Sequence, residues 1–208
     1  MKQKIISSDD FIKQLLTGWV DANNRYVNFL GKHDCCWWYN ERTNVSVLAG
    51  AAWTLGWAAI EEYPSRKKMK GCVQDDLYTS KGRVDLYITN SNDDVAIEAK
   101  HAWYLLENTF ESNRILNFRM DEAYADAKRL INQAGNQFAA TFIVFYTKMN
   151  AEGTINENHI DELISKVISK RGEKQSSYAY IFDSQFNYKN ELEYYYPSVA
   201  LILEKVNC

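Results

Sequence analysis

Residues 82–103, GRVDLYITNSNDDVAIEAKHAW, contain two apolar segments joined by a turn-rich stretch, and each segment carries charge in its interior. The alternation of apolar and polar residues is typical of β-strands, and the intervening NSNDD favours a hairpin. Because successive side chains of a strand face opposite sides, Val95 and Ile97 share one face, whereas Glu98 and Lys100 share the other. The sequence therefore predicts a hairpin that is apolar on one face and charged on the reverse.

The first strand of this hairpin carries Asp85 opposite three apolar side chains, those of Val84, Leu86 and Ile88. Pairing of the two strands would bring Asp85 close to Glu98 and Lys100. Two carboxylates in one place repel each other unless a cation lies between them. Mg²⁺ or Mn²⁺ would relieve the repulsion, because these ions prefer oxygen ligands and leave room for water and phosphate. Lys100 could then stabilise a developing negative charge or orient an ion-bound water.

A structural alternative stays open for these residues. A Glu and a Lys two positions apart also occur on half-exposed sheets, where they form a weak surface pair. The combination is more specific, because an Asp in one apolar strand is followed by a turn and by Glu-x-Lys in the next strand. Buried charges usually need a partner or a metal ion, so we favour a functional site over a structural pair.

A cluster of cations precedes the hairpin. The formal net charge of −3 gives no overall attraction to nucleic acid, so any such binding needs a local patch. The segment SRKKMK and the start of the hairpin supply the candidates for nucleic-acid binding, which are Arg66, Lys67, Lys68, Lys70, Lys81 and Arg83. The alternative is a solvated edge strand with its loop.

The rest of the sequence predicts an α/β protein that forms a single domain over residues 1–208. Before the hairpin we expect one or two short helices in 8–31, bounded by Gly18 and Gly31, a helix from 41 to Gly56, and an extended segment around Pro64. After the hairpin we expect a helix over 120–133, a doubly covered strand over 138–147, a helix over 160–168, and strands over 178–182 and 199–203.

No targeting or membrane segment is expected. No apolar run approaches the roughly 20 residues that span a bilayer, and polar residues interrupt the N-terminus too early for a signal peptide. The four cysteines, Cys35, Cys36, Cys72 and Cys208, form neither a zinc motif nor a disulfide framework. We therefore expect a cytoplasmic protein with reduced thiols and no membrane partner.

The spacing of the hairpin charges resembles the core motif of the PD-(D/E)XK nuclease superfamily. Asp85 is followed after twelve residues by Glu98-Ala99-Lys100. The predicted order of helix, three strands, helix and strand over about 40–147 is similar to the αβββαβ core of the restriction-endonuclease-like fold. That resemblance implies a mixed central sheet flanked by helices, with N-terminal helical and C-terminal α/β additions. Val84 stands where many members have proline, and the helix over 120–133 lacks the Gln-x-x-x-Tyr signature of the exonuclease-like branches.

The resemblance implies roles for individual residues. Asp85 and Glu98 would bind Mg²⁺ or Mn²⁺, the backbone carbonyl of Ala99 would add a ligand, and Lys100 would assist attack by water. Many members add a glutamate from the first helix of the core, for which Glu41 is the candidate. Two rivals for that role, Glu61 and Glu62, lie near Pro64 in the extended segment.

These roles imply a metal-dependent nuclease that hydrolyses phosphodiester bonds of nucleic acid, with DNA favoured over RNA. The alternative is a catalytically inactive protein of the same fold that acts as a protein-interaction or regulatory partner. A third and weaker interpretation is a plain nucleic-acid-binding surface. Relatives often act as dimers, so a homodimer is also expected.

Several other residues have a structural and a functional interpretation. His101 should point away from Lys100, which favours a core or surface histidine over a ligand. The aromatic run Trp37, Trp38 and Tyr39 could stack on bases, but core packing is favoured. On the helix over 120–133, three side chains could face the site or solvent, namely Tyr124, Asp126 and Lys128.

Overall fold

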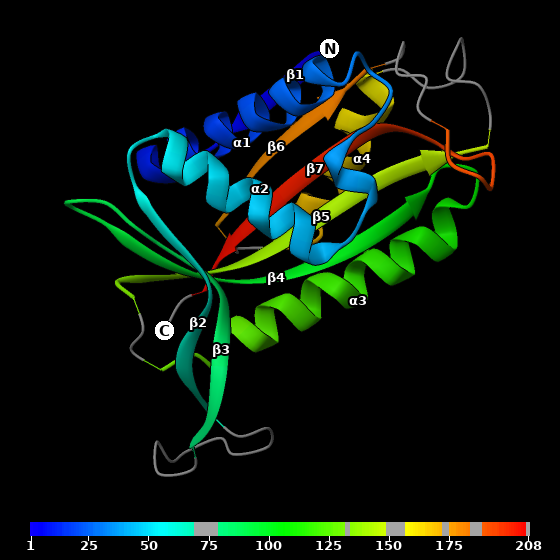
Figure 1. Cartoon of the computed structure of the whole chain (residues 1–208). Coiled ribbons are helices and arrows are strands. Elements are labelled where there is room, and N and C mark those ends of the chain that lie inside the picture. The colour runs from blue at the N-terminus through cyan, green and yellow to red at the C-terminus, as the bar shows by residue number, and fades with distance from the viewer. Residues whose placement is uncertain (69–78, 132–133, 149–156, 172–174, 184–188, 207–208) are drawn as a thin grey trace.

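The protein is an α/β structure in which seven strands form one mixed sheet with helices on both faces (Figure 1). The computed structural model describes residues 1–68, 79–131, 134–148, 157–171, 175–183 and 189–206. The strands are β1 (Lys2–Ile6), β2 (Ala58–Lys68), β3 (Thr79–Thr89), β4 (Asp94–Leu105), β5 (Asn136–Thr147), β6 (Ser176–Phe182) and β7 (Tyr195–Lys205). The helices are α1 (Asp10–Phe29), α2 (Glu41–Thr54), α3 (Thr109–Ala127) and α4 (Glu157–Ser169), with a short 3₁₀ turn at Cys36–Trp38.

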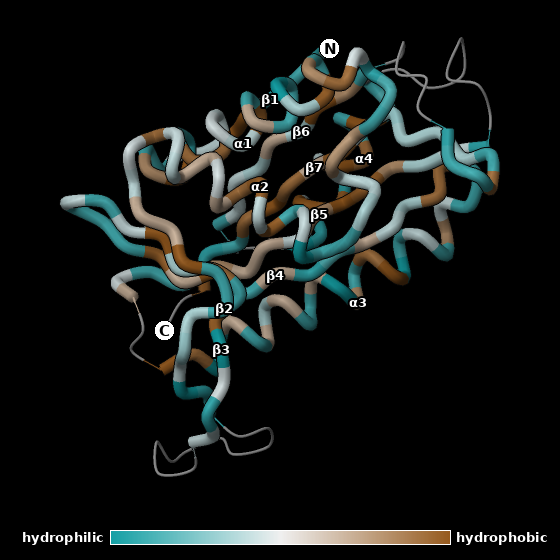
Figure 2. The backbone as a smooth tube through the Cα atoms, in the orientation of Figure 1, coloured by the Kyte–Doolittle hydropathy of each residue, from teal (hydrophilic) through white to brown (hydrophobic). Residues whose placement is uncertain are grey.

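The sheet order is β1-β6-β7-β5-β4-β3-β2. Strands β4 and β5 run parallel, and the other neighbours are antiparallel. The central strands β5 and β7 are buried along nearly their whole length, and apolar residues are concentrated there (Figure 2). The prediction of a doubly covered strand over 138–147 is therefore confirmed, because helices lie on both sides of the sheet.

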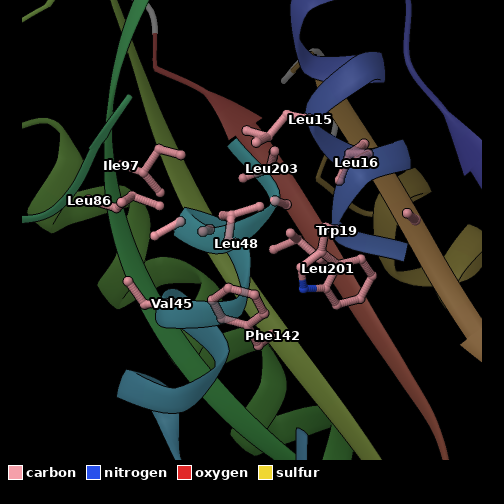
Figure 3. Close-up of a cluster of buried hydrophobic side chains, with 14 of the residues drawn as sticks. Leu15, Leu16, Trp19, Val45, Leu48, Leu86, Ile97, Phe142, Leu201 and Leu203 are labelled. Carbon is pink, nitrogen blue, oxygen red and sulfur yellow. The ribbon is translucent and has the colours of Figure 1, made fainter. Parts of the chain in front are cut away.

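Two hydrophobic layers hold the helices to the sheet. Helices α1 and α2 pack on one face, where Trp19 and Leu48 meet Leu86 and Ile97 of the predicted hairpin in a shared core (Figure 3). Helices α3 and α4 cover the opposite face through a second apolar cluster that includes Leu116. Strand β4 therefore has α2 on one side and α3 on the other, which places its charged residues near helices rather than in open solvent.

Helix α2 has clear start and stop signals. Asn40 caps its first turn, since its side-chain oxygen accepts the Thr43 N–H at 2.9 Å. At the other end, Gly56 has φ +78, and the amides of Gly56 and Trp57 donate to the carbonyls of Trp53 and Ala52 at 3.0 Å. This Schellman arrangement needs a left-handed residue, which glycine adopts without strain. The predicted end of the helix at Gly56 is confirmed.

The predicted order of elements is confirmed, but some bounds differ. Helix α1 is continuous through Gly18, whose predicted role as a boundary is wrong. A Cβ at Gly18 would lie 3.5 Å from the Ala51 Cβ, so this glycine permits close packing of α1 on α2. Helix α3 begins at Thr109 rather than 120, because exposed apolar residues such as Phe110 and Phe118 mask its periodicity. The edge strand β1 was not predicted.

The outer halves of β2 and β3 leave the sheet as a two-stranded arm, which we define as residues 63–68 and 79–84 (Figure 1). The arm is tied to the chain after α3, where the Lys68 amide donates to the Arg129 carbonyl at 2.8 Å and the Arg129 Nε donates back to the Lys68 carbonyl at 2.8 Å. This attachment fixes the position of the arm beside the C-terminal end of α3.

Within the described part of the chain, no helix combines the length and the apolar character that crossing a membrane requires. Cys35 and Cys36 are buried free thiols, while Cys72 and Cys208 lie outside the described residues.

The two glycines of the α2 region give a matched test of the fold. Gly56→Ala should lower the free energy of unfolding by about 1–2 kcal/mol, because a Cβ is strained in a left-handed conformation. Gly50→Ala, at an exposed interior position of α2 with open space around its Cα, should raise the free energy of unfolding by about 0.5–1 kcal/mol. Urea unfolding followed by circular dichroism measures both changes. Equal effects of the two substitutions would contradict the assignment of Gly56 as the helix end.

Candidate active site

The hydrogen-bonded ladder between β3 and β4 ends at Leu86 and Ile97, directly before the predicted site. Asp85 and Glu98 are the next residues along this register. On the other side of β3, Asp85 lies opposite Glu62 of β2, which has φ +54. A positive φ at a non-glycine residue is uncommon and distorts a strand locally. Asp85 and Glu98 therefore lie where the pairing of β3 with β4 ends and where the pairing of β2 with β3 is interrupted.

This distortion changes which way β3 faces. Val84 packs with Ala96 in a small cluster, whereas Leu86 and Ile88 pack in the core beneath α1 and α2. The predicted common face of these three residues is therefore wrong for Val84, because the strand turns at Asp85. In β4 the predicted alternation is confirmed at Ala96, which lies on the opposite face from the α1 and α2 core.

Two carboxylates replace the missing strand partner along the open edge of β4. The Ala99 N–H donates to Asp85 Oδ2 at 2.7 Å, and the His101 N–H donates to Glu41 Oε2 at 3.0 Å. Backbone amides removed from water need an acceptor, and a charged acceptor gives a strong hydrogen bond. The open edge of β4 therefore brings together an acid from β3 and an acid from the start of α2.

Asp85 and Glu41 also line a cavity of about 360 Å³ between α2 and β2, together with Asn40, Arg42, Val45, Glu61 and Glu62. The cavity gives these acids a path to solvent. Its acidic lining favours cations over anions, so a negatively charged phosphate would need a bound cation or Lys100 as a neighbour.

Glu98 is almost fully buried, with 2% of its side chain exposed, and its partner is Lys67 from the arm. The Lys67 Nζ lies 2.7 Å from Glu98 Oε1 and 2.8 Å from Oε2, but only the contact to Oε2 has hydrogen-bond geometry, so Oε1 lacks a hydrogen bond. Burial raises the pKa of Glu98 to about 7, the Asp85 carboxylate adds to this rise, and Lys67 opposes it. The ion pair therefore only partly compensates for the burial of the carboxylate.

Lys100 lies at the centre of the acidic residues. Its Nζ donates to the Ala99 carbonyl at 3.0 Å and lies 3.4 Å from Asp126 Oδ2 of α3. Burial lowers the pKa of the Lys100 ammonium, and three nearby carboxylates raise it by more, so that the net change is upward. These carboxylates belong to Glu41, Asp85 and Asp126. Lys100 therefore stays charged at neutral pH and is suited to stabilising negative charge rather than to accepting a proton.

Glu41 is the glutamate that lies with the motif residues. Burial raises its pKa and Asp85 adds to the rise, while the Lys100 ammonium lowers it. Its two rivals have other partners. Glu61 accepts a hydrogen bond from Ser46 at 2.9 Å, and Glu62 pairs with Arg42 at 2.9 Å and Arg83 at 3.1 Å. Glu41 differs from Glu61 and Glu62 in its position at the first turn of α2, from which its side chain reaches the open edge of β4.

The donor set fits the divalent ion that the resemblance implies. Asp85, Glu98 and the Ala99 carbonyl are oxygen ligands, and Glu98 Oε1 is a buried oxygen without a hydrogen bond. In the described residues, no group of three or more His, Cys, Asp or Glu is arranged to hold an ion by itself. Mg²⁺ usually takes only one or two protein carboxylates and completes its octahedron with water and phosphate, so two acids suffice.

The described residues of the predicted basic patch differ in exposure and in their partners. Arg66 and Lys81 are exposed on the arm, Lys68 is partly buried, and Arg83 pairs with Glu62. Lys67 turns inward to Glu98, with 15% of its side chain exposed. Lys70 lies outside the described residues.

The remaining candidates have structural surroundings. Burial lowers the pKa of His101 to about 4, so its ring is neutral, and it packs edge to face against Trp103. Trp37 is buried and its Nε1 donates to the Tyr196 carbonyl at 3.2 Å, which agrees with core packing. Tyr39 is 45% exposed, so the prediction of core packing is wrong for this residue.

On α3, the residue that faces the site is Asp126, through Lys100. Tyr124 packs beside a small apolar cluster, and Lys128 is exposed with its ammonium 5.6 Å from the Tyr124 ring centroid. Asp126 and Lys67 are the members of the site whose contacts the sequence did not predict. The period of α3 placed Asp126 among three candidates, whereas no local signal could show that Lys67 reaches across β3.

The raised pKa of Glu98 predicts a pH dependence of stability. Between the ordinary value of 4.5 and about 7, the folded protein holds a proton that the unfolded chain has lost, so the free energy of unfolding should fall as pH rises through this window. The fall should reach about 3 kcal/mol at about 1.4 kcal/mol per pH unit. In Glu98→Gln this fall should be missing, whereas Glu191→Gln, at an exposed position, should keep it. Denaturant titrations across this pH range measure it, and identical slopes in all three proteins would refute the assignment.

Comparison with known proteins assigns the chain to no family. No protein-family model, no curated protein and no solved structure matches the chain. The resemblance to PD-(D/E)XK nucleases therefore depends on the motif residues Asp85, Glu98 and Lys100, on the order of the elements, and on the geometry at the open edge of β4.

Proposed function

We propose that the protein is a Mg²⁺- or Mn²⁺-dependent nuclease that hydrolyses phosphodiester bonds of nucleic acid, with DNA as the favoured substrate. One observation carries the proposal. Asp85, Glu98, Lys100 and Glu41 come from three separate elements and gather at the edge where β4 loses its strand partner. Carboxylates that are removed from water beside one another raise the energy of the folded protein, and such clusters are typical of functional sites.

The fold supports the same proposal. In chain order, α2, β2, β3, β4, α3 and β5 give the αβββαβ sequence of a restriction-endonuclease-like core, in which β4 and β5 are the parallel pair. We propose that these elements form that core. On this proposal, α1 with β1 is the N-terminal addition, and α4 with β6 and β7 is the C-terminal addition.

Each residue has a separate chemical task in this proposal. Asp85 and Glu98 would hold the divalent ion together with the Ala99 carbonyl. When bound, the ion lowers the pKa of a water ligand and polarises the phosphate. Lys100 would place its ammonium against the negative charge that develops on the phosphate, and the pKa rise keeps it protonated for that task. Glu41 would hold the open edge of β4 in place, because its Oε2 accepts the His101 N–H.

A second candidate function has one specific observation in its favour. The Lys67 ammonium pairs with Glu98 and lies within 2.8 Å of both its oxygens, as a cation would that neutralises the acid in a protein of this fold without metal chemistry. Helix α3 also exposes Phe110 and Phe118, with 83% and 58% of their surface accessible, as a partner-binding surface would. This alternative is an inactive nuclease-fold protein that binds another protein, including a second copy of the chain.

The proposed nuclease is tested with purified protein on single- and double-stranded DNA and RNA in Mg²⁺ or Mn²⁺. Asp85→Asn and Lys100→Met should each lower the cleavage rate by at least about 100-fold, the scale for removing one group that stabilises transition-state charge. Two exposed residues far from the site provide charge-matched controls, Asp93→Asn and Lys13→Met, which should cleave at the wild-type rate.

Two results would remove the proposal. Cleavage that survives both Asp85→Asn and Lys100→Met would place the activity elsewhere. The absence of cleavage on every substrate with either ion, combined with no binding of Mn²⁺ in calorimetry, would leave the inactive interaction protein as the remaining function.

A further inference from the structure

We propose that Lys67 is an additional residue of the candidate site, a cation carried by the arm that competes with the divalent ion for Glu98. On this view the position of the arm controls whether Glu98 can bind the ion. The inference rests on the proposed function, because it concerns the same metal site, but its evidence is separate from the motif.

The first evidence is the geometry of the ion pair. Lys67 Nζ lies within 2.8 Å of both oxygens of Glu98, and the acid has 2% of its side chain exposed. An ion bound by Glu98 would need one of these oxygens, and the Lys67 ammonium lies beside both of them. Lys67 and a doubly charged ion would also repel each other at this distance. The two cations are therefore competitors rather than neighbours.

The second evidence is that the chain makes room for Lys67 to reach Glu98. Lys67 lies on β2, and the acid lies on β4, so the lysine stem must cross β3. It crosses at Gly82, where an added Cβ would lie 3.1 Å from Lys67 Cγ and Cδ. Any larger residue at this position would crowd the stem. Gly82 is part of the arm, so the path of the lysine is built into the same two strands.

The third line of evidence is that contacts with the chain after α3 hold the arm in this position. Lys67 forms an isolated bridge with Leu130. The neighbouring Lys68 donates its backbone N–H to the Arg129 carbonyl and accepts a hydrogen bond from the Arg129 side-chain Nε at its own carbonyl. The same segment connects to α3, which carries Asp126 against Lys100. The attachment therefore connects Lys67, which pairs with Glu98, to α3, whose Asp126 lies beside Lys100.

These observations distinguish Lys67 from a surface cation. An exposed ion pair contributes little and can rearrange freely, whereas a lysine that pairs with a buried acid is held by the cost of leaving that acid alone. Glu98 without Lys67 has one fewer competitor for the ion and no compensating charge. Removing Lys67 should therefore strengthen the binding of a divalent ion. If Lys67 had only a structural role, its removal would leave this binding unchanged or weaken it.

The test is isothermal titration with Mn²⁺ on the full chain, at a pH well above the pKa of Glu98. Lys67→Met should lower the Kd for Mn²⁺ by about tenfold relative to wild type, which corresponds to about 1.4 kcal/mol. The matched control is Lys128→Met, which removes one charge from the exposed end of α3 without touching Glu98 and should leave the Kd unchanged. Asp85→Asn should weaken binding.

A second variant keeps the test decisive if Lys67→Met does not fold, which circular dichroism shows directly. Gly82→Ala retains every charge but crowds the lysine stem, so it should also lower the Kd, by a smaller factor. An equal or higher Kd in Lys67→Met and Gly82→Ala, with Asp85→Asn still impaired, overturns the competition and leaves the metal site intact. If no variant binds Mn²⁺, the proposed function and this inference both fall.

Discussion

The open edge of β4 is the constraint on which the site depends. Strand β3 separates from β4 after the pair Leu86 and Ile97, so the amides of Ala99 and His101 face no neighbouring strand. A buried amide without an acceptor costs free energy, so these two amides need acceptors in place of a strand. Carboxylates from two other elements fill the gap, so the same defect that interrupts the sheet gathers acids around Lys100.

At the open edge of β4, acidic side chains outnumber the cationic side chains that contact them. Around Lys100 lie the carboxylates of Glu41, Asp85 and Asp126, and their combined effect outweighs the burial of the ammonium. Glu98 has Lys67 and still keeps a raised pKa. Of these acids only Glu98 is fully buried, and Asp126 has a second cation partner, since the Arg129 Nη1 lies 3.4 Å from Asp126 Oδ1. The remaining negative charge favours a further cation at this edge, and in the proposed function that cation is the divalent ion.

The sequence predicted the elements of the site better than their contacts. Period-two alternation located β3 and β4 and placed Glu98 and Lys100 on one face, because alternation is a local property of the backbone. It failed at Val84, where Glu62 on another strand distorts β3. Helix bounds were least accurate in α3, whose exposed aromatic residues resemble a core pattern. Sequence periodicity predicts which side chains of one strand or helix share a face, but it does not predict contacts between elements.

Lys67 shows why the remaining part of the site could not be predicted. In the sequence it belongs to a basic run, for which nucleic-acid binding is the natural interpretation. Its actual contact depends on three features that are distant in the chain, namely the strand that it crosses at Gly82, the bridge to Leu130 and the buried acid on β4. One lysine thereby joins the arm to the site. Any movement of the arm must either break the pair with Glu98 or carry it along, so the charge state of the site and the conformation of the arm cannot change independently.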